Sequence, residues 1–226
     1  VLEKGSEVGA HILSGAVIDP IGINQLLPDW KDLTPPTMDP VVRDDFYILG
    51  PAGNLKIPNI LLPRLMSNHG CYVTSLSNVV KWLGGIAQSM GIDIYPGFPA
   101  TEILYSNDRV AGVATGEFGI SKSGEKKDSY MQGMEIRAKY TVFAEGARGH
   151  LTKNIIDRYK LDAQSDIQKY GLGIKELWEI PSTKHLPGKV QHTMGWPLDN
   201  NTGGGSFMYH FDKNLVSVGF VVHLNY

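Results

Sequence analysis

Hydrophobic residues at helical spacing mark one helix clearly. Between residues 76 and 90 they recur every three or four positions, at Leu76, Val79, Val80, Leu83, Ile86, Ala87 and Met90. Ser75 precedes this run and can act as an N-cap, and Gly91 after it is a typical helix stop. We therefore predict a helix over 76–90. The apolar spacing after residue 150 predicts a second, shorter helix from Leu151 to Tyr159.

Short apolar runs bounded by Gly, Pro and Asn predict strands elsewhere. Pro58 and Pro63 favour an edge position for the two runs 46–49 and 55–62, because proline has no N–H to donate to a neighbouring strand. The predicted strands of the first part of the chain are 1–3, 46–49, 55–62, 92–97, 101–105, 110–117 and 134–143.

The pattern changes near residue 165. Four strand-like runs follow one another without an intervening helix, at 172–180, 190–196, 205–211 and 215–224. Sequential strands of this kind imply an antiparallel sheet. The chain is therefore predicted to be α/β (α+β), with a mixed first part and an antiparallel sheet at its C-terminal end.

Residues 144–150, Ala-Glu-Gly-Ala-Arg-Gly-His, connect a predicted strand directly to a predicted helix. Small residues let a ligand approach the backbone, and a helix N-terminus offers unpaired N–H groups. This connection suits a ribityl or phosphate group, or it is an ordinary packing turn.

Residues 9–30 combine small residues with an interrupted apolar run. Ser14 and Gly15 suit close contact with a ligand, whereas Pro20 and Gly22 prevent one long helix over 18–30. The apolar run fits either a segment lying in a membrane interface or ordinary packing in a core or loop. No apolar run in the sequence reaches the roughly 20 residues that span a bilayer.

Charge and cysteine content exclude several classes of function. The 21 basic and 23 acidic side chains give a formal charge of −2, which offers no support for nucleic-acid binding. Cys71 is the only cysteine, so the chain can form no internal disulfide and no cysteine-ligated metal cluster of its own. We expect Cys71 to be a small buried residue. The histidines lack metal-ligand spacing, and we assign no catalytic or metal-binding residue.

The two ends and a glycine triplet add three expectations. The chain starts and stops in strand-like runs, so we expect an internal piece of a longer protein. Glu3 closes the first strand, where dinucleotide folds place a ribose-binding acid, although an exposed strand end has the same appearance. The triplet 203–205 is no phosphate loop, because no Lys-Ser or Lys-Thr follows it. It forms either a hairpin turn or a bare surface against a flat ligand.

Several segments taken together resemble one family, the electron transfer flavoprotein–ubiquinone oxidoreductases. The most specific are Gly-Ile-Lys-Glu-Leu-Trp at 173–178 and Gly-Trp-Pro-Leu-Asp at 195–199. The resemblance covers the chain in order, and its other segments are 1–4, 9–17, 27–30, 68–70, 144–146, 149–151 and 204–207.

The resemblance implies a flavoenzyme, an electron-transferring-flavoprotein dehydrogenase. It would accept electrons from reduced electron transfer flavoprotein and pass them through FAD and a [4Fe–4S] cluster to ubiquinone in the respiratory chain. Residues 1–165 would be an FAD-binding Rossmann-like domain fragment without its N-terminal Gly-rich strand-turn-helix, and 166–226 the start of the antiparallel ubiquinone-binding domain. The enzyme would be monotopic, on the matrix side of the mitochondrial inner membrane or on a bacterial inner membrane.

The resemblance also implies roles for individual residues. Residues 8–29 would be the membrane-associated segment, with Trp30 as an interfacial anchor. Gly204 and Gly205 would contact ubiquinone, because a Cβ there would obstruct a planar ring. The residues that would contact FAD are Glu3, His11, Ser14, Gly15, Ala144, Glu145 and Gly146.

The sequence departs from the family pattern in three places. The Gly-rich pyrophosphate loop would precede Val1, and the cluster cysteines would follow Tyr226, so this piece should bind FAD poorly and cannot hold the cluster. Gly203 stands where an aromatic residue is expected. The alternatives are an FAD-dependent oxidoreductase of the geranylgeranyl-reductase or aromatic-hydroxylase type, or a truncated non-catalytic product.

Overall fold

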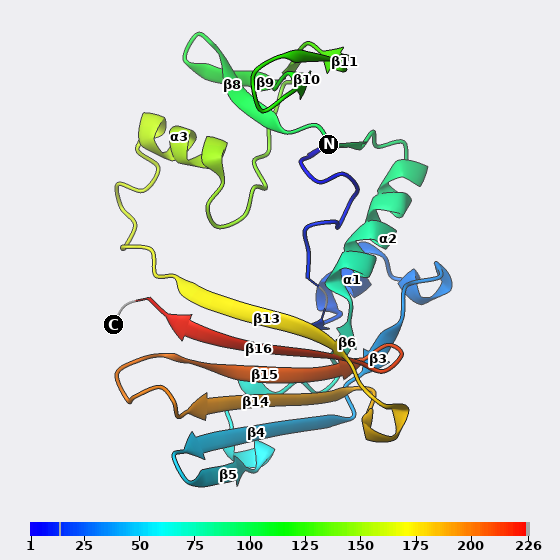
Figure 1. The fold of residues 1–226 in the computed structure, drawn as a ribbon, viewed down its shortest axis with the longest axis vertical. Helices are drawn as coiled ribbons and strands as arrows, with labels where there is room; N and C mark the ends of the chain where they lie inside the picture. Colours follow the sequence, from blue (N-terminus) through cyan, green and yellow to red (C-terminus); the bar gives the residue numbers. More distant parts are fainter. Residues whose placement is uncertain (14, 225–226) are drawn as a thin grey trace. The chain divides into compact units, whose positions relative to one another are not determined.

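The computed structural model describes residues 1–13 and 15–224, and these form two compact units (Figure 1). Unit 1 comprises Val1–Val8 and Gly91–Ile167, and unit 2 comprises Gly9–Met90 and Gln168–Tyr226. The predicted boundary at residue 165 separates an FAD-binding domain from a ubiquinone-binding domain, and this assignment stays a prediction. The chain crosses between the units close to that point, and unit 2 also takes in residues 9–90.

A six-stranded sheet forms the body of unit 2. Its strand order is β13-β16-β15-β14-β4-β5 (Figure 1). The strands are β13 (Gly171–Glu179), β16 (Leu215–His223), β15 (Gly204–Phe211), β14 (Lys189–Gly195), β4 (Arg43–Gly50) and β5 (Gly53–Ile57). The four C-terminal strands pair antiparallel, which confirms the sheet predicted from their succession.

The sequence pattern did not indicate that β4 would join this sheet. β4 pairs parallel with β14, from Lys189–Arg43 to Gly195–Leu49, and β5 completes the edge. The strand predicted over 55–62 ends at Ile57, and the chain continues as two short 3-10 helices, η2 (Asn59–Leu61) and η3 (Arg64–Met66). Pro58 and Pro63 immediately precede these turns, and their missing N–H groups stop further pairing.

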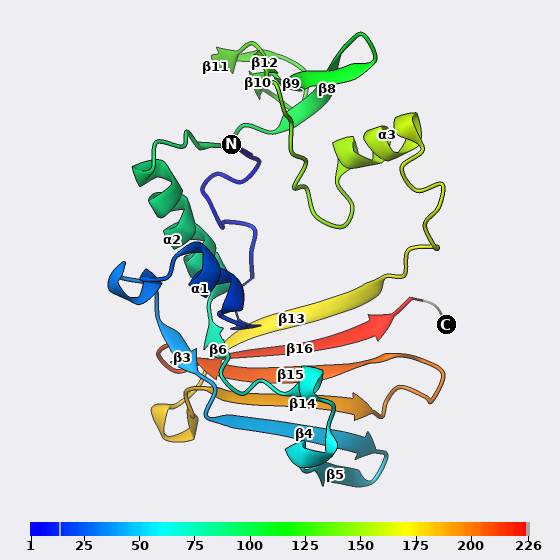
Figure 2. The same cartoon turned by 180° about the vertical axis from the view of Figure 1, so that it is seen from behind.

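The N-terminal part of unit 2 meets the six-stranded sheet at the end where β14 begins and β15 ends (Figure 2). This part contains a small sheet, β2-β6-β3, of Ala16–Ile18, Tyr72–Thr74 and Met38–Pro40. Val73, Val190 and Phe211 are buried together where β6 meets β14 and β15. The predicted helix is confirmed as α2 (Leu76–Ser89), and the hydroxyl of Ser75 accepts a hydrogen bond from the backbone N–H of Asn78 at 3.3 Å.

Trp30 is a core residue, so its predicted role as a membrane anchor is wrong. It begins the 3-10 helix η1 (Trp30–Asp32) and is 3% exposed. Its indole N–H donates to the side-chain oxygen of Asn24 at 2.7 Å, and the rings of Tyr72 and Trp82 pack edge-on against it. An indole that is buried and hydrogen-bonded within the protein is not available to a lipid interface.

Unit 1 contains a three-stranded sheet, a hairpin and a helix. The sheet has the order β12-β9-β8, and β1 pairs parallel with β7. The elements are β1 (Leu2–Glu3), β7 (Tyr95–Pro96), β8 (Ala100–Ser106), β9 (Arg109–Thr115), β10 (Phe118–Ile120), β11 (Lys126–Met131), β12 (Glu135–Arg137) and α3 (His150–Tyr159). The helix predicted over 151–159 is confirmed.

Two strands of unit 1 are shorter than predicted. The strand expected over 134–143 ends at Arg137, where its pairing with Gly112 of β9 also ends. The apolar residues beyond it, Tyr140 and Val142, are 91% and 88% exposed. The run 92–97 forms a strand only over Tyr95–Pro96. An apolar run forms a strand only as far as a neighbouring strand accepts its hydrogen bonds.

Candidate functional site

A cavity of about 600 Å³ lies in unit 2 against the six-stranded sheet. Strands β4, β14, β15 and β16 and the η3 segment contribute to its wall. Apolar side chains predominate, with Phe46 and Phe207 from the sheet and Leu65 and Met66 from η3. Both predicted quinone-contacting glycines, Gly204 and Gly205, line it. A largely apolar cavity with few polar groups is typical of a small-molecule site.

Gly204 and Gly205 lie within β15, so the alternative of a hairpin turn is wrong for these two residues, whereas Gly203 lies in the connection before the strand. Their φ angles are +147° and +158°, which side chains rarely adopt. A Cβ on Gly204 would collide with the carbonyl oxygen of Val221, and one on Gly205 with the carbonyl oxygen of Thr193. The approach of the neighbouring strands therefore requires glycine at both positions, and it keeps this part of the cavity wall free of side chains.

Polar groups in and beside the cavity form three pairs. The hydroxyls of Thr193 and Ser206 are 2.5 Å apart. The Nε2 atom of His192 lies 2.7 Å from the hydroxyl of Tyr209. Behind them, the carboxylate of Asp44 accepts hydrogen bonds from the backbone N–H of Asn68 at 2.8 Å and from its side-chain amide at 3.1 Å.

Burial favours the neutral forms of the two ring side chains. It lowers the pKa of His192, and the nearby carboxylate of Asp44 opposes this effect only in part. Burial also raises the pKa of Tyr209 to about 12, with a further contribution from Asp44. The phenol of Tyr209 is therefore protonated at neutral pH, and it can donate a hydrogen bond to the imidazole.

Gly203 stands where the family resemblance leads us to expect an aromatic residue, and it lies next to the ring of His223. A Cβ on Gly203 would collide with the ring of His223, which also lines the cavity. The backbone N–H of His223 donates to the carbonyl oxygen of Gly203 at 2.9 Å. A side chain at position 203 would therefore displace the His223 ring as it lies here.

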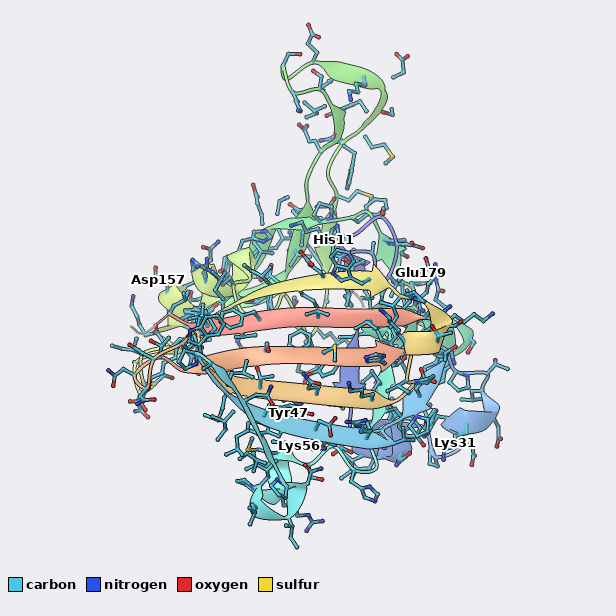
Figure 3. All side chains as sticks on the ribbon, turned by 60° about the horizontal axis from the view of Figure 1, so that its bottom comes forward. His11, Lys31, Tyr47, Lys56, Asp157 and Glu179 are labelled. Atoms are coloured by element: carbon cyan, nitrogen blue, oxygen red, sulfur yellow. The ribbon has the colours of Figure 1, made fainter. Side chains whose placement is uncertain are left out.

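Two of the predicted flavin-contacting residues are described in unit 2, and a third, Ser14, lies outside the described residues. His11 is exposed (Figure 3). Gly15 is buried with φ at +96°, and a Cβ there would collide with the side chain of Ser217 on β16. The ammonium group of Lys175 on β13 donates to the carbonyl oxygens of Gly15 at 2.6 Å and Leu13 at 3.3 Å. Lys175 thus ties this segment to the sheet.

The remaining predicted flavin contacts are in unit 1. The carboxylate of Glu3 accepts a hydrogen bond from the backbone N–H of Gly5 at 2.5 Å. Gly146 has φ at +78°, and a Cβ built on it would meet nothing within 4 Å, while Ala144 beside it is exposed. The backbone of this bend is therefore accessible to a ligand.

Glu145 has a structural role that the sequence did not reveal. Its carboxylate accepts hydrogen bonds from the backbone N–H and the hydroxyl of Thr152, both at 2.7 Å, and lies 3.2 Å from Nδ1 of His150. Burial alone would raise the pKa of Glu145, but the hydrogen bonds from Thr152 and Leu151 and the charge of His150 hold it below its usual value. Glu145 thus stabilises the first turn of α3.

The described residues contain no cluster of three or more His, Cys, Asp or Glu side chains that could hold a metal ion. Cys71 is half-buried, and burial raises the pKa of its thiol. Within the same described part of the chain, no helix is both long enough and apolar enough to cross a bilayer.

Sequence comparison relates the whole chain to one family. The family model "ETF-QO, ubiquinone-binding" matches residues 170–226. The chain is 51% identical to an electron transfer flavoprotein–ubiquinone oxidoreductase of Pseudomonas aeruginosa, 50% to a mitochondrial one of Dictyostelium discoideum and 47% to a mitochondrial one of Mus musculus. All of the chain is matched in each case, and it spans 42%, 37% and 37% of the three relatives. The resemblance drawn from its motifs is confirmed.

Solved structures confirm the α/β (α+β) fold class. The fold is similar to that of a geranylgeranyl bacteriochlorophyll reductase-like protein from Thermoplasma acidophilum, with a TM-score of 0.59 and 15% identity, covering 97% of this chain and 49% of that one. A flavin-dependent halogenase gives the same TM-score and identity, with 98% of this chain and 36% of that chain covered. Identity at this level establishes a common fold alone.

Proposed function

Because its sequence is related over its whole length to part of the electron transfer flavoprotein–ubiquinone oxidoreductases, we propose that the chain is part of such an enzyme. The whole enzyme takes electrons from reduced electron transfer flavoprotein and delivers them to ubiquinone. The observation that carries this proposal is the apolar cavity of about 600 Å³ whose wall includes Gly204 and Gly205.

The cavity suits a flat, lipid-soluble ring. The two glycines leave one stretch of wall bare, and Phe46, Phe207 and Leu65 supply apolar contacts. Few polar groups line it, among them the hydroxyls of Thr193 and Ser206. A small number of polar groups in an apolar cavity can orient the carbonyl oxygens of a quinone without opposing burial of the ring.

FAD is the proposed cofactor, and when bound it supplies a carrier that accepts one or two electrons. Glu3 would bind a ribose hydroxyl, and the other proposed contacts to the cofactor are His11, Ser14, Gly15, Ala144, Glu145 and Gly146. Gly146 fits this role, because its positive φ and open surroundings leave the backbone bare. The carboxylate of Glu145 would stabilise α3, and the backbone of Glu145 would contact the cofactor.

The whole enzyme would also hold a [4Fe–4S] cluster. Cluster ligands are cysteine thiolates, and Cys71 is the only cysteine among these 226 residues. The ligands of the proposed cluster therefore have to come from another part of the protein.

The proposed enzyme lies on a membrane surface through residues 8–29. Within this segment the helix α1 (Ile21–Leu26) has no buried residue, and Ile21 and Leu26 are 62% and 73% exposed. Exposed apolar side chains on a short helix suit a monotopic contact. We place the enzyme on the matrix side of the mitochondrial inner membrane, or on the inner membrane of a bacterium.

The experiment is a reconstitution with the full-length protein, reduced electron transfer flavoprotein and a water-soluble ubiquinone analogue. Catalytic loss of the quinone absorbance, dependent on the reduced flavoprotein, is expected. A flavin-containing preparation that reduces no quinone would overturn the proposal and favour an FAD oxidoreductase of the geranylgeranyl-reductase type. Purified full-length protein that lacks flavin would favour a non-catalytic product.

A further inference from the structure

Reduction of a quinone needs protons as well as electrons, and the cavity contains a group that can supply one. Two electrons and two protons convert a quinone to a quinol. Of the described residues that line the cavity, only His192 and His223 have imidazole side chains, which can take up and release a proton. His223 is exposed at the end of β16, whereas His192 is partly buried in the middle of the sheet.

His192 is held by a partner that suits both of its protonation states. The hydroxyl of Tyr209 lies 2.7 Å from Nε2, and Tyr209 is fixed in turn by stacking on Phe207 with ring centroids 4.8 Å apart. The hydroxyl can donate to a neutral imidazole or accept from a protonated one. In either case the contact with Tyr209 engages Nε2 and leaves Nδ1 as the second ring nitrogen of this cavity residue.

The charged surroundings of His192 favour proton uptake when negative charge enters the cavity. Asp44 from β4 attracts the protonated ring, and its carboxylate is held by Asn68, another cavity residue. The other titratable groups facing this region are Tyr209 from β15 and His223 from β16. Without a reduced ligand, burial keeps the ring neutral, so protonation would follow the arrival of electrons.

We propose that His192 is the catalytic acid that protonates one oxygen of the reduced quinone, with Tyr209 as its positioning residue. This inference rests on the proposed function. As the quinone gains two electrons from the reduced enzyme, the N–H bond of protonated His192 breaks and an O–H bond forms, and the N–H electron pair stays on the imidazole. Solvent supplies the proton that restores His192 and the proton for the second quinone oxygen.

The test uses the full-length flavin-loaded enzyme and separates two half-reactions. His192→Gln is expected to slow quinone reduction at least tenfold, because a positioned general acid typically contributes roughly 10²- to 10⁴-fold. Reduction of its flavin by reduced electron transfer flavoprotein is expected to keep the wild-type rate. His69→Gln makes the same chemical change at an exposed histidine and is the matched control, with both rates unchanged.

The pH profile distinguishes proton donation from a structural role. The wild-type rate of quinone reduction should fall as pH rises, because the acid form of His192 is lost, and His192→Gln should lack this fall. Tyr209→Phe keeps the stacked ring and removes only the hydroxyl, and it should shift the pH at which the rate falls. Wild-type rates and profiles in both variants would overturn the inference. Absence of quinone reduction in the wild-type enzyme would overturn the proposed function instead.

Discussion

At the scale of single residues, the two cavity glycines have a structural reason beside the predicted one. Gly204 and Gly205 were predicted to be bare because a quinone ring needs the space. The structure gives a second reason, since the carbonyl oxygens of Val221 and Thr193 already occupy the space of a Cβ. The sequence around the two glycines does not reveal these contacts, because the contacting atoms belong to strands β14 and β16.

The substitution Gly205→Ala should therefore damage both stability and activity. We expect the free energy of unfolding to fall by about 1–3 kcal/mol, as for other overpacking changes. Quinone reduction by the full-length enzyme should fall at least as far as the folded fraction. Urea denaturation and the quinone assay measure the two effects. Gly53→Ala is the control, because a Cβ there meets nothing within 4 Å, and equal behaviour of the two variants would contradict the steric argument.

Glu145 gives a prediction on stability and pH. Glu145→Gln should lower the free energy of unfolding by about 1 kcal/mol, comparable to the loss of a helix cap. The pKa of Glu145 in the folded protein lies below its ordinary value. Its contribution should therefore be complete above that ordinary value and be lost as the pH falls through the lower, folded value.

Denaturation curves of wild type and Glu145→Gln measured between pH 7 and acid conditions test this expectation. The difference between the two proteins should shrink as the pH falls. The exposed Glu102, changed to Gln, serves as the control. A difference that stays constant with pH would exclude the ionised carboxylate as the source of the stabilisation.

At the scale of elements, β13 holds the predicted flavin-adjacent segment through the side chain of Lys175. Lys175 donates to the carbonyl oxygens of Leu13 and Gly15, and burial lowers the pKa of its ammonium group. In the sequence, the motif Gly-Ile-Lys-Glu-Leu-Trp indicates only the resemblance to a family. In the structure, Lys175 of this motif binds the carbonyl groups of Leu13 and Gly15, which lie more than 150 positions earlier in the chain.

Lys175→Met should loosen this segment and weaken FAD binding by the full-length protein about tenfold or more. Each lost hydrogen bond to a charged group is worth about 1.5–3 kcal/mol. Lys175→Arg keeps the charge and should retain most of the affinity. Flavin retention on dilution, followed by fluorescence, is the measurement. Equal retention in wild type and Lys175→Met would show that the segment does not need this tie.

The short helix α1 is the element that carries the membrane prediction. Ile21→Lys or Leu26→Lys should reduce binding of the full-length protein to liposomes, because each places a charge where an apolar side chain is exposed. Leu27 is a poorer choice, because it is only partly exposed. Ile120→Lys, on a hairpin of unit 1, adds the same charge and is the control. Co-sedimentation that is equal for all variants would contradict a membrane contact at α1.

At the scale of the whole molecule, the chain folds as two units whose residues alternate along the sequence. Residues 1–8 and 91–167 form one unit, and residues 9–90 pack with the C-terminal sheet in the other. The predicted flavin contacts are divided between them, with Glu3 and the bend at 144–146 in unit 1 and His11 and Gly15 in unit 2. The proposed quinone cavity belongs to unit 2 alone.

The sequence by itself determined the features that depend on neighbouring residues. Apolar spacing located α2 and α3, and Ser75 marked the start of α2. The uninterrupted succession of four strands determined the antiparallel sheet, because strands close in sequence can pair through short turns. Rare motifs revealed the similarity to one family, because such a motif is a property of the local sequence and needs no tertiary information.

Only the tertiary structure decided the features that depend on distant residues. The parallel pairing of β4 with β14 joins residues more than 140 positions apart, and it places Phe46 and Asp44 beside His192. The burial of Trp30 and the early end of β12 likewise depend on which partners are present. Strand pairing and burial depend on two segments in contact. The pattern of residues along one segment does not show which distant segment it contacts.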